Sequence, residues 1–174
     1  MKYDIKIYEP TNTNPDFRFA LGTKGINPLF VFGLNPSTAD DKKSDRTISK
    51  IMSFASLNNF DSFIMCNLYP QRATHPSSLD KKINLILHKQ NISIIKSLLN
   101  NHTNFSILGA WGNNILDRYF LADCLKDIFN LTKDKNNWFK LGELTKLGHP
   151  RHPSRISYQL KLTQFDIYTY INKL

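Results

Sequence analysis

The chain has 174 residues, of which 41% are hydrophobic and 21% are charged, a composition that is ordinary for a soluble globular protein. No stretch approaches the roughly 20 apolar residues that span a bilayer, and the N-terminus lacks a signal peptide's apolar run, so we expect a cytoplasmic protein without a membrane partner. An excess of 23 Lys and Arg residues over 14 Asp and Glu residues gives a formal net charge of +9. This charge favours a polyanionic partner, either nucleic acid (DNA above all) or a nucleotide.

The first half of the chain begins with short apolar-rich segments. Residues 5–8 and 17–21 are expected to form a hairpin or an edge pair of strands. Residues 29–34 are an apolar run typical of a buried central strand, and residues 45–58 carry apolar side chains at helical spacing. Residues 63–67 are predicted to form a second buried strand.

The second half of the chain continues the alternation. A long irregular loop over residues 68–79 is followed by an expected helix over residues 80–99 and a strand over residues 105–109. The remaining expected elements are a helix over 114–129, a strand over 138–141, a polar loop over 145–155 and a helix over 164–173.

This order of elements predicts one α/β domain covering residues 1–174, a three-layer α/β/α sandwich with a largely parallel central sheet. Ligands of such sheets bind at the carboxyl ends of the strands. Four predicted strands lead into polar loops, at residues 35–37, 67–69, 111–113 and 149–154. We therefore expect these loops to converge on one site, in a protein that is a monomer.

The cysteine and histidine residues do not indicate a metal centre. Cys66 and Cys124 lack metal-ligand spacing, and Cys66 lies within an apolar strand, where a reduced core thiol is expected. The five histidines show no His-x₃-His pair. We expect no metal and no cofactor.

The segment 29–40, Leu-Phe-Val-Phe-Gly-Leu-Asn-Pro-Ser-Thr-Ala-Asp, delivers a polar loop to the end of the third predicted strand. Asn35 precedes Pro36 and is therefore held out of the α region. Ser37, Thr38 and Asp40 could cap the next helix or direct backbone amides at an anion. The plain alternative is a strand-to-helix connection without a chemical role.

Five segments together identify the chain as a member of a bacterial and phage family, domain-of-unknown-function family 1643, over roughly residues 17–157. The segments are 30–40, 45–48, 67–74, 110–112 and 148–153, and the Asn-Pro-Ser-Thr-Ala-Asp block is the most specific. The family name carries no function.

A more distant resemblance does imply an activity. Gly33-Leu34-Asn35-Pro36 is similar to the first motif of the uracil-DNA glycosylase superfamily, and the strand leading to Asn67 resembles the strand whose asparagine reads a pyrimidine. His152-Pro153-Ser154 is similar to its closing motif, which carries a leaving-group histidine. The resemblance implies a uracil-DNA-glycosylase-like fold and a DNA glycosylase-like enzyme that excises an altered or modified base by N-glycosidic bond hydrolysis.

The catalytic candidates under this hypothesis are Asn35, His152 and Asp40. Asn35 could hold a water molecule but cannot deprotonate it, because an amide is not a base. Asp40 and Asp45 are the nearest carboxylates that could help, although both could instead cap the helix over residues 45–58. His152 could donate a hydrogen bond to the charge that develops on the departing base.

The candidate ligand contacts lie at the ends of two predicted strands. Asn67 could read a pyrimidine edge or bond to its own turn, and Tyr69 could stack on a base or belong to the rim of the core. The residues expected to contact the base or ligand are Gly33, Leu34, Pro36, Ser37, Asn67 and Tyr69.

Basic and hydroxylated side chains in the later loops are the candidate phosphate contacts, which position nucleic acid without specifying its sequence. They are Arg72, Thr74, Arg151, Ser154 and Arg155. Two alternatives to the glycosylase stay open. One is a non-catalytic nucleic-acid or nucleotide-binding domain, suggested by the absence of a carboxylate at position 35. The other is a different nucleotide- or phosphate-processing enzyme, with Ser37 and Thr38 cradling a phosphate.

Overall fold

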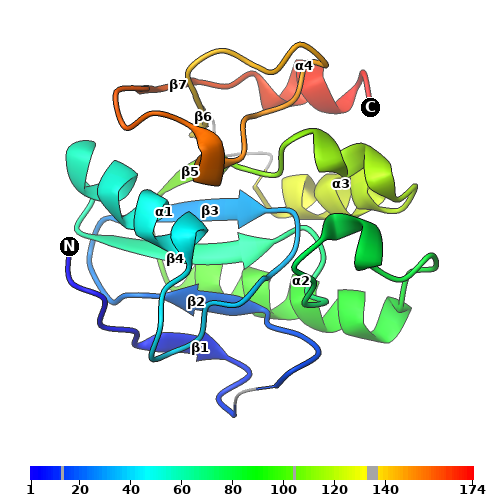
Figure 1. Ribbon diagram of the computed structural model, residues 1–174, viewed down its shortest axis with the longest axis horizontal. Coiled ribbons are helices and arrows are strands. Elements are labelled where there is room, and N and C mark those ends of the chain that lie inside the picture. Colours follow the sequence, from blue (N-terminus) through cyan, green and yellow to red (C-terminus); the bar gives the residue numbers. More distant parts are fainter. Residues whose placement is uncertain (13, 104, 133–136) are drawn as a thin grey trace.

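The computed structural model describes residues 1–12, 14–103, 105–132 and 137–174 (Figure 1). Within these residues, seven strands form one sheet in the order β1-β2-β4-β3-β5-β6-β7. The strands are β1 (Ile7–Glu9), β2 (Ala20–Gly22), β3 (Pro28–Gly33), β4 (Ser62–Asn67), β5 (Ser106–Gly109), β6 (Trp138–Leu141) and β7 (Leu162–Gln164). In Figure 1, β1 and β7 lie at opposite ends of the sheet.

The sheet is mixed, so the expectation of a largely parallel sheet is wrong for the sheet as a whole. The four central strands β4, β3, β5 and β6 are parallel to one another. The other three pairings, β1 with β2, β2 with β4 and β6 with β7, are antiparallel. The expected edge pair near the N-terminus is confirmed. No helix joins β1 to β2 in the described chain, and a parallel pair needs a longer crossover connection than this.

Helices cover both faces of the sheet, which gives the α/β class three layers (Figure 1). Helix α1 (Arg46–Leu57) packs on one face. Helices α2 (Leu85–Asn100) and α3 (Leu121–Thr132) pack on the other, together with the short α4 (Ile167–Ile171). Three short 3₁₀ turns complete the described elements, namely η1 (Pro76–Ser78), η2 (Asn113–Asp117) and η3 (Pro153–Arg155).

Strand β3 shows why the core has two halves. Its side chains alternate, so that Leu29 and Val31 join the cluster around α1, whereas Phe30 and Phe32 join the cluster on the side of α2 and α3. All six residues of β3 are buried. A strand that is covered on both faces reads as a continuous apolar run, which is the pattern that predicted it.

Several element boundaries differ from the expectation because local caps and turns decide them. Helix α2 begins later than residue 80, since the side chain of Asn84 accepts a hydrogen bond from the Leu87 amide and caps the helix. The helix expected over residues 114–129 divides into η2 and α3. The helix expected over 164–173 is preceded by β7 and begins only after Asp166, which caps α4.

The described chain contains neither a disulfide bond nor a helix that could cross a membrane. Cys66 and Cys124 are both free and buried, as the sequence indicated for Cys66. Among the described residues, no helix has the length and apolar character needed to cross a membrane.

The attachment of β2 to the sheet gives a testable prediction. A Cβ atom at Gly22 would collide with the backbone carbonyl oxygen of Phe63 on β4, which cannot move aside without breaking the sheet. We expect Gly22→Ala to lower the free energy of unfolding by about 1–3 kcal/mol, as overpacking does. Urea unfolding measures this loss. The exposed Lys24→Ala variant serves as the control, and an equally stable Gly22→Ala variant would contradict the packing of β2 on β4.

Candidate functional site

A cleft of about 680 Å³ lies at the carboxyl ends of the four parallel strands. Its walls come from the segments that follow β3, β4, β5 and β6, and Arg18 and Met65 add to them. Three of the four loops that were expected to converge, at residues 35–37, 111–113 and 149–154, contribute to this cavity, whereas residues 67–69 do not line it and later residues of the same connection, between Ala73 and Ser77, do. Its volume falls within the range of roughly 300–1,000 Å³ that is typical of small-molecule sites.

The cleft brings together some of the predicted site residues and leaves others outside. Those that line it are Leu34, Asn35, Ser37, Thr74, Arg151, His152, Ser154 and Arg155. Those that do not line it are Gly33, Pro36, Asp40, Asn67, Tyr69 and Arg72.

Asn35 locks two of the loops together and keeps one acceptor for a ligand. Its Nδ2 donates to the carbonyl oxygen of Ala73 at 2.9 Å and to that of Pro36 at 3.0 Å. The loop after β3 is thereby fixed to the loop after β4. No group in the described chain donates to Oδ1 of Asn35, which leaves this oxygen able to accept a hydrogen bond in the cleft.

His152 lines the opposite wall, where Gly112 gives it room. Gly112 has a φ of +71°, and a Cβ atom there would lie 3.3 Å from the Cβ of His152. Nδ1 of His152 lies 2.9 Å from Oγ of Ser154 and accepts from the Ser154 amide at 3.4 Å. Acceptance at Nδ1 places the proton of the neutral ring on Nε2. Burial lowers the pKa of His152, against the opposing effect of Asp45.

Two carboxylates line the cleft, Asp45 and Asp117, and the predicted Asp40 does not. Asp45 lines the cleft and also caps α1, because its Oδ1 accepts from the Ile48 amide at 2.9 Å. Oδ1 of Asp40 accepts from the amides of Lys42 and Lys43 at 2.8 and 2.7 Å, outside the cleft. These two hydrogen bonds are the main reason that the pKa of Asp40 is lowered. The expected capping role therefore falls to Asp45, which also brings its charge to the cleft.

Asn67 lies behind the cleft wall with its polar atoms unsatisfied. The side chain is fully buried, and neither Oδ1 nor Nδ2 has a hydrogen-bond partner among the described residues. A Cβ atom added to Gly33 would lie 3.0 Å from Oδ1 of Asn67 and 2.5 Å from Cε of Met65, which itself lines the cleft. The absence of a side chain at Gly33 thus provides the space that Met65 and Asn67 share.

Tyr69 belongs to the core. It is fully buried, its ring centroid lies 5.0 Å from that of Phe120, and its hydroxyl accepts from the Asn84 amide at 2.9 Å. This placement agrees with the alternative that the sequence left open, an aromatic residue of the core rather than a stacking platform.

The predicted phosphate contacts fall into two groups. Arg72 is tied to the protein, since its guanidinium donates to the carbonyl oxygens of Asn14 and Ser37 and to the hydroxyl of Tyr8. Arg151 donates from Nε to the Glu143 carbonyl oxygen at 2.7 Å. Arg155 lines the cleft, is exposed and has no hydrogen-bond or ion-pair partner in the described chain.

Arg18 lines the cleft and was missed by the sequence analysis. Its side chain is only 2% exposed, and Nη1 donates to the carbonyl oxygen of Ala39 at 2.6 Å. Its Nε has no partner among the described residues. Burial, together with the nearby charge of Arg72, lowers the pKa of Arg18 to about 10, so the group stays charged at neutral pH. No sequence pattern marks it, because it stands between Phe17 and Phe19 like the polar residue of an edge strand.

A buried polar chain supports the wall formed by Trp111. Nε1 of Trp111 donates to the hydroxyl oxygen of Tyr170 at 3.0 Å, and the same hydroxyl is hydrogen-bonded to Nδ1 of His149 at 2.7 Å. Burial raises the pKa of Tyr170 to about 12, so this hydroxyl keeps its proton. The chain joins the end of β5 to the loop after β6 and to α4.

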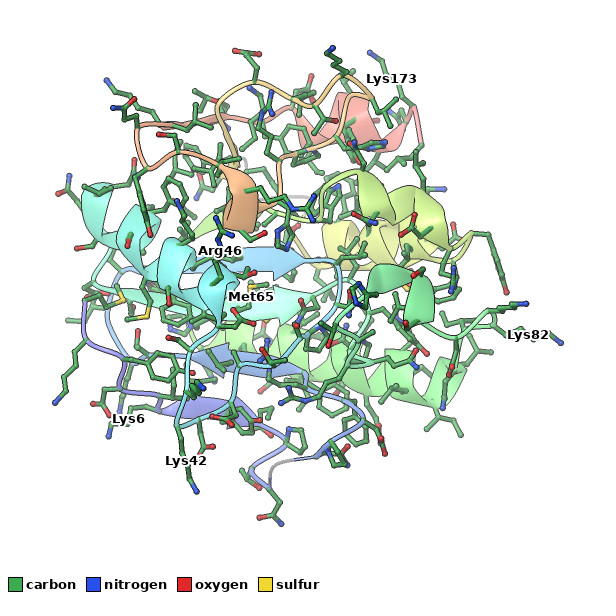
Figure 2. The ribbon with its side chains drawn as sticks, viewed as in Figure 1. Lys6, Lys42, Arg46, Met65, Lys82 and Lys173 are labelled. Carbon is green, nitrogen blue, oxygen red and sulfur yellow. The ribbon has the colours of Figure 1, made fainter. Side chains whose placement is uncertain are left out.

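Arg18, Arg151 and Arg155 line the cleft, and other basic residues lie outside it. Lys6, Lys42, Lys82 and Lys173 are all exposed; Lys6 and Lys42 project at the lower left of Figure 2, Lys82 at the right and Lys173 at the top right. The net charge therefore does not by itself mark one binding face. Among the described residues, no group of three His, Cys, Asp or Glu side chains could hold a metal ion.

The burial of His149 predicts a pH dependence of stability. Desolvation lowers the pKa of His149 below the value of about 6.5 that it takes in the unfolded chain, so below that pH the unfolded chain binds the proton first. This part of the stability is complete above about pH 6.5 and is lost as the pH falls towards the folded-state pKa. Urea unfolding at about pH 7.5 and pH 5.5 should show a smaller loss in His149→Gln than in the native chain. An equal loss of stability in the native chain and in His149→Gln would contradict the lowered pKa of His149.

Comparison with known proteins gives the chain a family. A search of curated proteins and a search of solved structures each found no match. The family model described as "Protein of unknown function (DUF1643)" matches residues 18–154, which include β2 to β6 and most of the residues that line the cleft. The chain belongs to the DUF1643 family.

Proposed function

We propose that this protein is a glycosylase-like enzyme that hydrolyses the N-glycosidic bond of an altered or modified base in DNA. The observation that carries the proposal is the presence of Asn35, Asp45 and His152 in one cleft, the first two from the loop between β3 and α1 and the third from the loop after β6. The three-layer α/β fold with its parallel centre agrees with the finer proposal of a uracil-DNA-glycosylase-like fold.

These three side chains match the requirements of the reaction. Cleavage gives an oxocarbenium-like sugar and an anionic base, and a water molecule must reach C1′ of the sugar. Oδ1 of Asn35 could accept a hydrogen bond from that water, and the carboxylate of Asp45 could take its proton and stabilise the positive sugar. As the C1′–N bond breaks, its electron pair passes to the base, where Nε2–H of neutral His152 could donate to the developing charge.

Asn67 supports base recognition by the same cleft. A buried amide without partners costs free energy, on the order of 1–3 kcal/mol per unsatisfied group. A pyrimidine edge offers both a donor and an acceptor, which are the partners that Asn67 lacks. Met65 lines the cleft, and its Cε and the Oδ1 of Asn67 both lie beside Gly33. The Met65 side chain is unbranched and adaptable, so a flipped base could reach the amide by moving it.

A second candidate function is a nucleotide-binding domain without catalysis. Arg155 favours it, because an exposed arginine that lines the cleft without a partner in the described chain could bind a phosphate group. The capping role of Asp45 also favours it, since that role explains the residue without any chemistry.

The test is base excision on a panel of DNA duplexes that carry uracil, mismatched thymine or hydroxymethylated or glycosylated pyrimidines, followed by heating in alkali. Strand cleavage at one base is the expected result. Asp45→Asn retains a good helix cap and removes only the charge, and we expect it and His152→Gln to lower the cleavage rate by about 100-fold or more. DNA binding should change by less than about threefold, because these groups act on the transition state.

Asp40→Asn is the matched control, because Asp40 lies outside the cleft on the same loop. It should cleave at the native rate. Intact strands across the whole panel, together with tight binding of DNA or nucleotide, would contradict the enzyme proposal and support a binding domain without catalysis. Equal rates in Asp40→Asn and Asp45→Asn would remove Asp45 from the mechanism.

A further inference from the structure

Arg18 carries a buried positive charge without a paired carboxylate. It is 2% exposed, and no carboxylate of the described chain forms an ion pair with it. Asp45 attracts it only at longer range. A buried charge that lacks a hydrogen-bonded counter-charge costs several kcal/mol, so side chains of this kind are normally paired.

A second arginine increases this cost. Nη1 of Arg18 donates to the carbonyl oxygen of Ala39 at 2.6 Å, and Nη1 of Arg72 donates to the same oxygen at 3.3 Å. Two guanidinium groups therefore meet at one acceptor and repel each other. Arg72 is held there by its bonds to other residues, so the repulsion is built into the fold.

Arg18, which lines the cleft, also retains unused donors. Its Nε has no partner in the described chain, and neither has its Nη2. Ser37 lines the same cleft, and its hydroxyl is without a partner among the described residues. A guanidinium donates in a fork that fits two oxygens of one phosphate or carboxylate group.

We propose that Arg18 is the anion-binding residue of the cleft and that it takes the terminal phosphate group of a nucleotide. A terminal phosphate can enter the cleft and reach a side chain that is almost fully buried, whereas the phosphodiesters of a duplex stay on its outer surface. The anion supplies the negative charge that the pair of arginines lacks. This inference stands apart from the proposed hydrolysis, because binding is measured without turnover.

The experiment measures thermal unfolding and calorimetric binding with inorganic phosphate, thymidine 5′-monophosphate and thymidine, at constant ionic strength. Oligonucleotides with and without a 5′-phosphate distinguish a free nucleotide from a DNA end. We expect saturable stabilisation by phosphate and by the monophosphate, and none by thymidine. Arg18→Met should lose about 10- to 100-fold in affinity for the monophosphate, the effect of losing hydrogen bonds to a charged group.

Arg18→Met should fold, because Arg72 still donates to the Ala39 oxygen, and without ligand it should be at least as stable as the native chain. Arg18→Lys keeps the positive charge and should bind the monophosphate more weakly than the native chain. This variant tests the proposal if Arg18→Met fails to fold. The exposed Lys82→Gln variant is the control and should bind as the native chain does. Absence of saturable phosphate binding in the native chain, or an equal response in Arg18→Met, would overturn the proposal.

Discussion

The parallel pairing of β3 with β4 and β5, and of β5 with β6, is the constraint on which the candidate site depends. It places the carboxyl ends of four strands at one edge of the sheet, so that residues more than a hundred positions apart share one cleft. Backbone hydrogen bonds then hold the loops in register, for example from the amide of Gly112 to the carbonyl oxygen of Pro150 at 3.0 Å. Asn35 does the same between the loops that follow β3 and β4.

Two buried polar side chains at the candidate site have atoms without partners in the described chain. Among the residues that the structure describes, Arg18 is buried without a counter-ion, and both polar atoms of Asn67 are unsatisfied. Each feature destabilises the folded protein, yet both lie against the same cleft, Arg18 in its wall and Asn67 behind Met65. Binding sites commonly accept such a loss of stability for function. A nucleotide with a terminal phosphate and a base edge would offer partners to both groups.

The sequence predicted the central strands well and the site only in part, for physical reasons. Buried parallel strands are apolar on both faces, so β3 and β4 were visible as runs. Strand β7 is only three residues long and largely exposed, so it was not predicted, and its last residue was taken as the start of a helix. Asn35 and His152 were found because they belong to recognisable motifs. Arg18 was not, because only the tertiary fold buries it, and no local pattern separates such an arginine from one on a surface strand.

The most direct test of the account is to record ¹H–¹⁵N spectra of the protein while a nucleoside 5′-monophosphate is added. The side-chain Nε–H of Arg18 and the Nδ2 protons of Asn67 are buried reporters that can be followed one by one. The account predicts that both signals shift together and saturate at the same nucleotide concentration, because one ligand reaches both groups. Shifts confined to exposed lysine-bearing segments, with these two signals unmoved, would contradict the claim that the cleft is a nucleotide site.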